Sequence, residues 1–265
     1  MLAKRLIACL DVVKDRVTKA KGFEDNIDVE AADVLAERLY EDQVDEIIFY
    51  DIKASADKRM IDLDNVRRVA QRVFVPFTVG GGIRGLDDMF QALKAGAEKI
   101  SVDSMAVRNP DIISQGAKAF GRQCMVLSMQ VKRVEKSPSI PSGYEIAIDG
   151  ARVFTGMDAV EWAKRGEGLG AGEIVVNSID QDGSLAGYDI AITKAIAANV
   201  NIPVIASGGA GNIDHVAEVF QETGVSAAII SSLLYSPRMP RLYAISEIKN
   251  ELASRNIPIR AMVSQ

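Results

Sequence analysis

The sequence predicts a single α/β domain, a (β/α)8 TIM barrel spanning residues 1–265. With 265 residues, of which 48% are hydrophobic and 25% charged, the chain is long enough to bury one large core. Short runs rich in β-branched residues alternate with longer amphipathic segments eight times. The second half of the chain also repeats the glycine and serine pattern of the first, so we divide the barrel into half-barrels of about 1–122 and 123–265.

The β-branched runs predict eight strands, each of them short. The strands are expected at Arg5–Asp11, Glu46–Asp51, Phe74–Val79, Lys99–Val102, Cys124–Gln130, Glu173–Ser178, Pro203–Ser207 and Ala227–Ser231. Helices are expected between them, at Ala31–Asp42, Asp87–Ala95, Pro110–Phe120, Met157–Leu169, Ile190–Ala198 and His215–Glu222. A doubly wound open sheet is the alternative architecture, but a repeat of four plus four units favours a closed ring.

One long segment, from residue 131 to residue 156, interrupts this alternation. Tyr144, Ile146 and Ile148 alternate within it and are followed by Asp149-Gly150, a dipeptide typical of tight turns. The segment therefore predicts a small hairpin in the loop after the fifth strand.

The composition favours a small-molecule ligand. A net charge of −5 and a pI of about 5.1 provide no basic face for nucleic acid or an anionic membrane. No apolar stretch approaches the roughly 18 residues of a membrane-spanning helix, so we expect a soluble, cytoplasmic protein with no membrane partner. Cys9 and Cys124 lie in apolar runs and are expected to pack as small hydrophobic residues.

Glycine-rich turns follow the third and seventh predicted strands. Gly81-Gly82 recurs 127 residues later as Gly208-Gly209, and Ser104 recurs 128 residues later as Ser232. The backbone N–H groups of such turns, with a serine hydroxyl and a helix N-terminus, can bind a phosphate without a cationic side chain. One glycine run alone can be just a tight turn, but two matching sites predict a substrate with two phosphates.

Four aspartates follow predicted strands at the edge where the active sites of such barrels lie. They are Asp11, Asp51, Asp180 and Asp182. An aspartate there can transfer protons, or it can hold a loop by accepting backbone hydrogen bonds; we favour proton transfer for Asp11 and a loop or ligand-hydroxyl role for Asp182. The internal repeat pairs Asp11 with Gln130, whose amide cannot take or give a proton at ordinary pH.

The segments Met1–Val12, Phe77–Ile83 and Ile205–Gly211 read MLAKRLIACLDV, FTVGGGI and IASGGAG. They resemble the cyclase subunit of imidazole glycerol phosphate synthase, and the resemblance covers nearly the whole chain. It implies a lyase of histidine biosynthesis that uses ammonia from a glutaminase subunit, its heterodimer partner, docked at the N-terminal face of the barrel. Ammonia converts a bis-phosphorylated phosphoribulosyl-formimino carboxamide ribotide into imidazole glycerol phosphate and an aminoimidazole carboxamide ribotide. The resemblance implies no metal and no redox cofactor.

The resemblance also assigns roles to individual residues. It makes Asp11 the essential acid/base, places Gln130 at a second catalytic position and makes Lys19, in the loop after the first strand, a substrate contact. The substrate- and phosphate-binding set that we expect is Lys19, Asp51, Gly82, Asp103, Ser104, Asp182, Gly183, Gly209, Ser231 and Ser232.

Four charged residues that begin different strands resemble the salt-bridged ammonia gate of this family. They are Arg5, Glu46, Lys99 and Glu173. Two acids and two bases can close a neutral ring at the N-terminal mouth and still let a small neutral molecule pass. Without the resemblance, such charges would be taken for solvated surface groups.

Several positions depart from the family at the catalytic mouth, and two of them concern catalytic or phosphate-contacting residues. Gln130 stands where the family has a second catalytic aspartate, and Asp103 stands where it has an asparagine. Losing a general acid or base costs roughly 10² to 10⁴ in rate. A cyclase that works with Asp11 is the function we favour. The alternatives are a conduit that passes ammonia from a glutaminase to another protein, such as a sugar amidotransferase, and an inactivated form of the cyclase.

Overall fold

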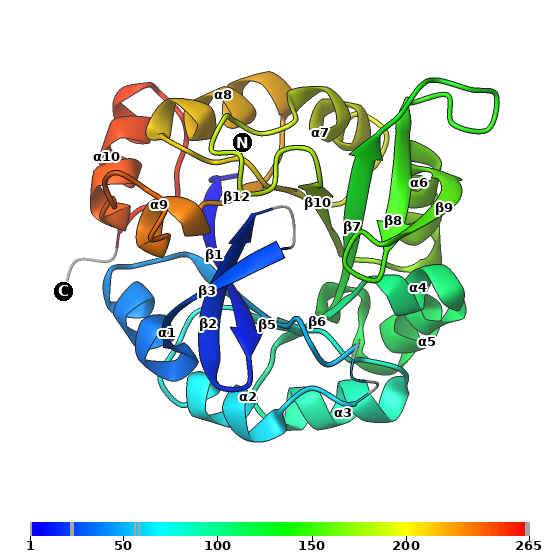
Figure 1. Ribbon diagram of the computed structural model, residues 1–265, viewed down its shortest axis with the longest axis horizontal. Helices are drawn as coiled ribbons and strands as arrows, with labels where there is room; N and C mark the ends of the chain where they lie inside the picture. The colour runs from blue at the N-terminus through cyan, green and yellow to red at the C-terminus, as the bar shows by residue number, and fades with distance from the viewer. Residues whose placement is uncertain (1, 22–23, 56, 58, 263–265) are drawn as a thin grey trace.

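The computed structural model is a closed barrel of parallel strands surrounded by helices (Figure 1). The structure describes residues 2–21, 24–55, 57 and 59–262. The barrel strands are β1 (Arg5–Val13), β4 (Glu46–Asp51), β5 (Phe77–Gly80), β6 (Lys99–Val102), β7 (Met125–Arg133), β10 (Glu173–Ser178), β11 (Val204–Ser207) and β12 (Ala227–Ile229). Each strand pairs in parallel with the next, β12 pairs with β1, and the pairing of β7 with β10 completes the ring. The predicted (β/α)8 barrel is confirmed, and the open sheet is excluded.

The helices form the outer layer of the barrel (Figure 1). They are α1 (Ala32–Glu41), α2 (Leu63–Ala70), α3 (Leu86–Lys94), α4 (Ser104–Arg108), α5 (Asp111–Phe120), α6 (Ala159–Leu169), α7 (Ile190–Ala197), α8 (Ile213–Thr223), α9 (Ser231–Tyr235) and α10 (Ile245–Ser254), with a 3-10 turn η1 at Arg122–Cys124. All six predicted helices form, within two residues of their predicted bounds. Within the described residues, no helix is long and apolar enough to cross a membrane.

Helix α2 was not predicted because it is short and mostly polar. The side chain of Asp62 caps its N-terminus by accepting hydrogen bonds from the backbone N–H groups of Asp64 and Asn65. Val66 and Val69 lie on one face, one turn apart, and both are fully buried. A cap and two apolar contacts are therefore enough to form this helix.

Alternate residues of each barrel strand point into the barrel, as the two-residue period of a strand requires. The middle layers form a small interior cluster that is separate from the larger core between strands and helices. Its members are Ile7, Cys9, Ile48, Val126, Val175, Ile205, Ala227 and Ile229, with Tyr50 packed against it. On β1 the same alternation places Arg5 below this cluster and Asp11 above it, so each end of the barrel holds polar side chains.

Two antiparallel hairpins extend the barrel at its C-terminal end. Strands β8 (Tyr144–Ile148) and β9 (Val153–Asp158) continue from β7 and confirm the predicted hairpin. Strands β2 (Arg16–Lys21) and β3 (Glu24–Ala31) were not predicted. In Figure 1 this second hairpin crosses in front of the barrel. Its sequence is rich in charged residues and lacks the alternation of apolar and polar residues that predicts a strand.

The glycine turns after β5 and β11 make matching backbone contacts. Gly81 and Gly208 both have a φ of 91°, a conformation that favours glycine. A Cβ atom on Gly81 would lie 2.3 Å from the carbonyl oxygen of Asp51, and one on Gly208 would lie 3.0 Å from the carbonyl oxygen of Ser178. Each contacted residue ends the preceding strand, and the two are themselves 127 residues apart (178 − 51), which supports the half-barrel interpretation.

Candidate active site

The C-terminal ends of the barrel strands bring Asp11 and Lys19 together. Asp11 is the last inward residue of β1, and hairpin strand β2 folds back on β1 with Thr18 opposite Asp11. The neighbouring Lys19 places its Nζ 3.2 Å from Oδ2 of Asp11. The sequence predicted Lys19 in a loop, whereas the structure fixes it on a strand, directly beside the predicted acid/base.

The Lys19 ammonium group is enclosed, with 12% of the side chain exposed, and it lies 5.2 Å from the centre of the Tyr235 ring. Burial alone lowers the pKa of an ammonium group, but Tyr235 and the Asp11 carboxylate outweigh it, so the pKa of Lys19 is raised above its usual range. The charge of Asp182, in the loop after β10, acts on Lys19 in the same direction. Lys19 is therefore a permanent cation next to Asp11.

A second polar pair, formed by Asp103 and Gln130, lies across the mouth at the ends of β6 and β7. The amide nitrogen Nε2 of Gln130 donates to Oδ2 of Asp103 at 2.7 Å. Its amide oxygen Oε1 accepts from the backbone N–H of Ala151, in the β8/β9 turn, at 2.8 Å. Both ends of the amide are occupied, which fixes its orientation. Gln130 and Asp103, two of the departures from the family pattern, are thus partners in one hydrogen bond.

The carboxyl group of Asp103 lies in an environment that favours its protonated form. Burial raises the pKa of this carboxyl group to about 7, and the negative charge of Asp149 also raises it. The hydrogen bond from Gln130 acts in the opposite direction and lowers the pKa. The guanidinium group of Arg108 lowers this pKa less, because it is half-exposed and forms an ion pair with Asp149. Asp103 therefore exchanges its proton near neutral pH.

Asp51 lies at the end of β4 but outside the inward row, which Tyr50 occupies instead. Its carboxylate is 1% exposed and accepts hydrogen bonds from both terminal nitrogens of Arg59, at 2.6 and 2.8 Å, and from the backbone N–H of Ala54 at 3.0 Å. Of the two roles open to an aspartate at the mouth, these contacts favour holding a loop. That loop packs on the Gly81-Gly82 turn.

The first predicted phosphate site combines the Gly82 turn with Asp103 and Ser104. The backbone N–H of Gly82 donates to the hydroxyl of Ser55 at 3.2 Å, so this loop joins the site as well. Ser104 begins α4, and its hydroxyl accepts from the backbone N–H of Asp149 at 3.0 Å. The sequence did not reveal Ser55, because nothing in the loop after β4 marks its approach to the glycine turn.

The second predicted phosphate site lies at the ends of β11 and β12. Gly209 has a φ of 101°, and a Cβ there would lie 1.9 Å from the carbonyl oxygen of Gly187, so only glycine fits. Ser232 is partly exposed nearby on α9. The Ser231 hydroxyl instead donates to the carbonyl oxygen of Cys9 at 3.0 Å and accepts from its N–H at 2.7 Å, which ties α9 to β1.

Gly183 and Asp182 lie in the loop that follows β10, next to the second phosphate site. The backbone N–H of Asp182 donates to the carbonyl oxygen of Ser178 at 2.9 Å, and Gly183 turns the chain with a φ of 66°. This loop therefore bridges the second glycine turn and the Lys19 side of the mouth.

The N-terminal end of the barrel is closed by a ring of four charges. Arg5 forms ion pairs with Glu46 and, at 2.9 Å, with Glu173. Lys99 forms ion pairs with the same two carboxylates, at 3.3 and 2.9 Å. The four side chains are between 4% and 16% exposed, so they are enclosed rather than solvated. The ring that the sequence predicted at this end is present, with each acid bound to both bases.

Three aromatic or amide side chains of the mouth were missed by the sequence analysis. The hydroxyl of Tyr50 lies 3.0 Å from that of Ser101, inside the barrel. Tyr235 lies over Lys19. Asn177, on the inward row of β10, has a buried Oδ1 with no partner among the described residues. Counting every second residue from the strand starts would have found Tyr50 and Asn177, whereas the position of Tyr235 depends on how α9 packs.

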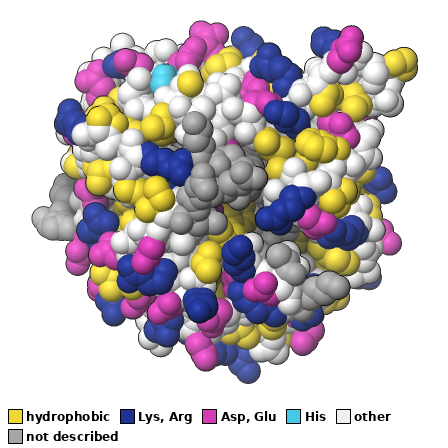
Figure 2. Space-filling model, viewed as in Figure 1, with side chains coloured by type: hydrophobic (Ala, Val, Ile, Leu, Met, Phe, Trp, Pro, Cys, Tyr) yellow, Lys and Arg dark blue, Asp and Glu magenta, His cyan; other side chains and the backbone are white. Residues whose placement is uncertain are grey.

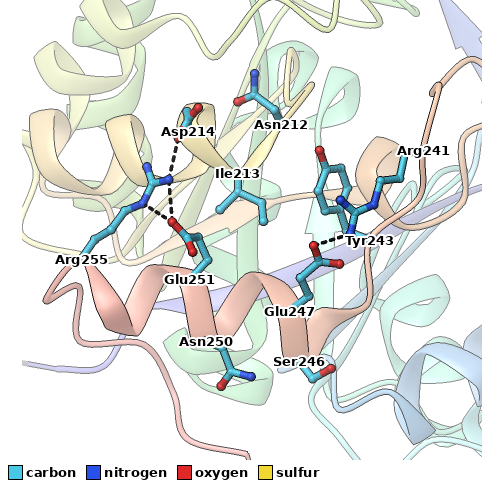
Figure 3. A pocket seen from close by; sticks show the side chains of 10 residues that line it. All are labelled: Asn212, Ile213, Asp214, Arg241, Tyr243, Ser246, Glu247, Asn250, Glu251 and Arg255. Atoms are coloured by element: carbon cyan, nitrogen blue, oxygen red, sulfur yellow. Dashed lines mark hydrogen bonds and ion pairs between the residues drawn. The ribbon is translucent and has the colours of Figure 1, made fainter.

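A cleft on the outer surface, between α8 and α10, lies outside this site (Figure 3). Arg255 in this cleft forms ion pairs with Asp214 and Glu251, and Arg241 with Glu247. On the face shown in Figure 2, basic and acidic side chains are interspersed in the same manner. These charges neutralise one another locally, so they add no further anion-binding patch.

Comparison with known proteins gives matches over most of the chain. A family described as "Histidine biosynthesis protein" matches residues 5–240. The chain is 53% identical over 260 residues to the imidazole glycerol phosphate synthase subunit HisF of Desulfatibacillum aliphaticivorans, covering 98% of both chains. It is 52% identical over 260 residues to the HisF subunit of Nitratidesulfovibrio vulgaris (strain DP4) and 53% identical to that of Syntrophobacter fumaroxidans, in each case covering 98% of this chain and 99% of the relative.

Proposed function

Because the chain belongs to the histidine biosynthesis protein family, and within it to the HisF-type cyclase subunits of imidazole glycerol phosphate synthase, we propose that its C-terminal mouth is the cyclase site. The observation that carries this proposal is the pairing of Asp11 with the enclosed Lys19 at 3.2 Å. The Lys19 ammonium group holds the Asp11 carboxylate in position at the mouth, where a carboxylate can accept a proton from a bound substrate. Asp11 then serves as the general base.

The proposed reaction is the lyase reaction of this family. The substrate is the bis-phosphorylated formimino carboxamide ribotide, which with one ammonia yields imidazole glycerol phosphate, an aminoimidazole carboxamide ribotide and one water. Ammonia nitrogen enters the new ring, the sugar carbonyl oxygen leaves as water, and the C–N bond to the departing aminoimidazole breaks. Protons must leave the sugar chain and the entering nitrogen and must be delivered to the departing nitrogen, so a base and an acid are both needed.

The two glycine turns are the proposed phosphate sites. Gly82 and Ser104 bind one phosphate, and Gly183, Gly209 and Ser232 bind the other. The left-handed glycines bring the backbone close to an anion, where N–H groups can donate to it. Asp51 and Ser231 support these sites from behind, by holding the loop after β4 and by tying α9 to β1. Lys19 and Asp182 contact the substrate between the two phosphates.

The charge ring of Arg5, Glu46, Lys99 and Glu173 is the proposed ammonia gate, with a glutaminase subunit docked outside it at the N-terminal face. The ring is neutral, and the layer above it consists of apolar side chains such as Ile7 and Val175. A neutral ring below an apolar layer admits NH3 and opposes charged NH4+, because an ion pays a large desolvation penalty there. The nitrogen source thus enters at the opposite end from the substrate.

The test is turnover of the ribotide by the purified chain at high ammonium salt, which replaces the glutaminase. We expect imidazole glycerol phosphate to form, with the rate rising as pH converts NH4+ to NH3. The matched control is Asp87→Asn, an exposed carboxylate on α3, which leaves the rate unchanged. Tight binding of the ribotide without any product would contradict the proposal and favour an inactivated form of the cyclase, whereas neither binding nor product would favour the ammonia conduit.

A further inference from the structure

We propose that Asp103 is the second proton-transfer residue of the mouth, acting as the general acid opposite Asp11, and that Gln130 is its positioning residue. This inference rests on the proposed function, because it names a reacting group of that same site. It is carried by the hydrogen bond between Gln130 Nε2 and Asp103 Oδ2 at 2.7 Å. The pair stands where a cyclase needs an acid and where the sequence suggested only an amide.

The topology places Asp103 across the mouth from Asp11. On β6 the inward row runs through Lys99 and Ser101, and Asp103 is the next inward position, directly after the strand. Strands β4 and β5 separate β1 from β6 around the ring. Asp11 and Asp103 therefore approach a substrate in the mouth from different sides, so one can remove a proton while the other supplies one.

The hydrogen bonds of Gln130 determine which oxygen of Asp103 carries the proton. The backbone N–H of Ala151 holds the amide oxygen of Gln130, so its NH2 group must face Asp103. In a protonated carboxyl group the carbonyl oxygen accepts hydrogen bonds better than the hydroxyl oxygen does. The N–H donor on Oδ2 therefore favours Oδ2 as the carbonyl oxygen and Oδ1 as the oxygen that carries the proton. Oδ1 is then the oxygen that donates to the substrate.

Burial and the groups around Asp103 set the pH range in which its carboxyl group can release and regain a proton; the side-chain hydrogen bonds of Gln130 and Ser104 lower its pKa. Asp149, in the β8/β9 turn, repels a negative charge on Asp103, whereas Arg108 on α4 favours one but is shared with Asp149. Tyr50 faces it from β4 as a neutral phenol, because burial raises its pKa above the usual range. In contrast, the enclosed Lys19 serves Asp11. Burial raises the pKa of Asp103 to about 7, which is the range in which a general acid works best.

Substrate binding strengthens this assignment. Ser104, next to Asp103, belongs to the proposed first phosphate site, and a bound phosphate would raise the pKa of a neighbouring carboxyl group further. The protonated form also avoids repulsion between the carboxyl group and that phosphate. In the reaction, Asp103 gives its proton to the nitrogen of the departing aminoimidazole as the C–N bond breaks, and it regains a proton removed from the sugar chain or the entering nitrogen.

The test is the pH dependence of ammonium-supported turnover for the parent, Asp103→Asn, Asp87→Asn and the exchanged double variant Asp103→Asn/Gln130→Asp. Free NH3 is held constant at each pH. We expect kcat of Asp103→Asn to fall roughly 10² to 10⁴-fold, with KM changed less than about threefold. Its pH–rate profile should also lack the titration limb near pH 7. The double variant returns a carboxyl group to the same hydrogen bond and is expected to recover at least about tenfold over Asp103→Asn.

A further variant, Gln130→Met, keeps Asp103 and removes only the donor. Since that hydrogen bond lowers the pKa of Asp103, we expect the titration limb of the pH–rate profile to move to higher pH. This readout applies even if Asp103→Asn does not fold. This inference would be overturned if the parent turns over substrate and Asp103→Asn has the same pH–rate profile as the parent, or differs from it only in KM. The cyclase function would then still stand. No turnover by the parent would overturn the proposed function and this inference with it.

Discussion

The two ends of the barrel neutralise their charges in different ways. At the N-terminal end, Glu46 and Glu173 each bind both Arg5 and Lys99, so every charge has two opposite neighbours. At the C-terminal end, Asp11 has the cation Lys19, whereas Asp103 has the amide of Gln130. An amide provides a dipole but no charge, so Asp103 becomes neutral by taking up a proton instead.

This difference indicates a structural role for the charge ring at the N-terminal end and a chemical role for the aspartates at the C-terminal end. In the ring, each charged side chain is held by two opposite charges, which suits a structural role. The Asp103 carboxyl group, whose hydrogen-bond partner is the uncharged amide of Gln130, changes charge near pH 7, which suits proton transfer. Variants of the two ends are therefore expected to affect different properties, and the following predictions compare them.

The largest effect is expected at Asp11. Asp11→Asn removes the base but keeps the size of the side chain, so we expect kcat with ammonium to fall roughly 10² to 10⁴-fold, or about 3 to 5 kcal/mol in the barrier. The melting temperature should change less than in a variant of the charge ring, because the Asp11 side chain is 32% exposed and a solvated ion pair contributes less to stability than an enclosed one. Steady-state kinetics and thermal unfolding of the same samples check both parts, and an unchanged kcat would remove Asp11 from the mechanism.

The opposite pattern is expected for the charge ring. Glu173→Gln leaves Arg5 and Lys99 with one carboxylate between them, and removing one partner of an enclosed ion pair should lower the free energy of unfolding by about 2 to 4 kcal/mol. Ammonium-supported kcat should stay within about threefold, because no reacting group is changed.

The matched control for the ring is Lys164→Met. Lys164 pairs with Glu161 on the exposed surface of α6, and such pairs contribute less than about 1 kcal/mol. Urea unfolding measures both variants. Equal stability losses in the two would show that the ring behaves as ordinary surface charge.

A smaller effect tests whether the second glycine turn is required by geometry. Gly209→Ala would place its Cβ 1.9 Å from the carbonyl oxygen of Gly187 at a φ of 101°, so we expect a loss of about 1 to 3 kcal/mol. Substrate affinity should weaken as the turn shifts. Gly168→Ala, inside α6 with open space around it, should instead stabilise the chain by up to about 1 kcal/mol. If Gly209→Ala were as stable as the parent, the turn would not depend on glycine.

The smallest effect is a pH-dependent stability difference at Asp103. Its carboxyl pKa rises from 3.8 to about 7 on folding, so the folded chain binds a proton more tightly than the unfolded chain. Stability is then lost as pH rises from about 4 to 7, and the loss is complete above that range. Asp103→Asn cannot ionise, so its stability relative to the parent should increase by about 1 to 3 kcal/mol between pH 4.5 and pH 8. A constant difference between the two unfolding curves would contradict the raised pKa.

Much of the barrel was predictable because its strands are apolar, short and regularly spaced. The alternation of side chains fixes Asp11 at the mouth and Arg5 at the gate, and both follow from the sequence of β1. The β2/β3 hairpin was not predictable, because its sequence lacks a continuous apolar row and its strands are held by the pairing of β2 with β1 and of β3 with β2. The position of Lys19 next to Asp11 depends on that hairpin.

The site was predictable where it depends on local sequence and unpredictable where it depends on contacts between distant segments. The glycine turns and the ring residues belong to the first class. The hydrogen bond between Asp103 and Gln130 belongs to the second, since it joins residues 27 positions apart and is fixed by Ala151 from a third segment. In sequence, Gln130 indicates a lost acid, whereas in the structure it orients another carboxyl group.

The most direct test of this account is a titration of the aspartate carboxyl groups in the free parent protein. Carboxyl-labelled aspartate, observed by ¹³C NMR from pH 3 to pH 9, reports each group, and the Asp103→Asn variant identifies the signal of Asp103. We expect this signal to titrate near pH 7 and expect Gln130→Met to move its midpoint upward. A midpoint for Asp103 near the ordinary aspartate value of about 4 would contradict the proposed difference between the two ends of the barrel.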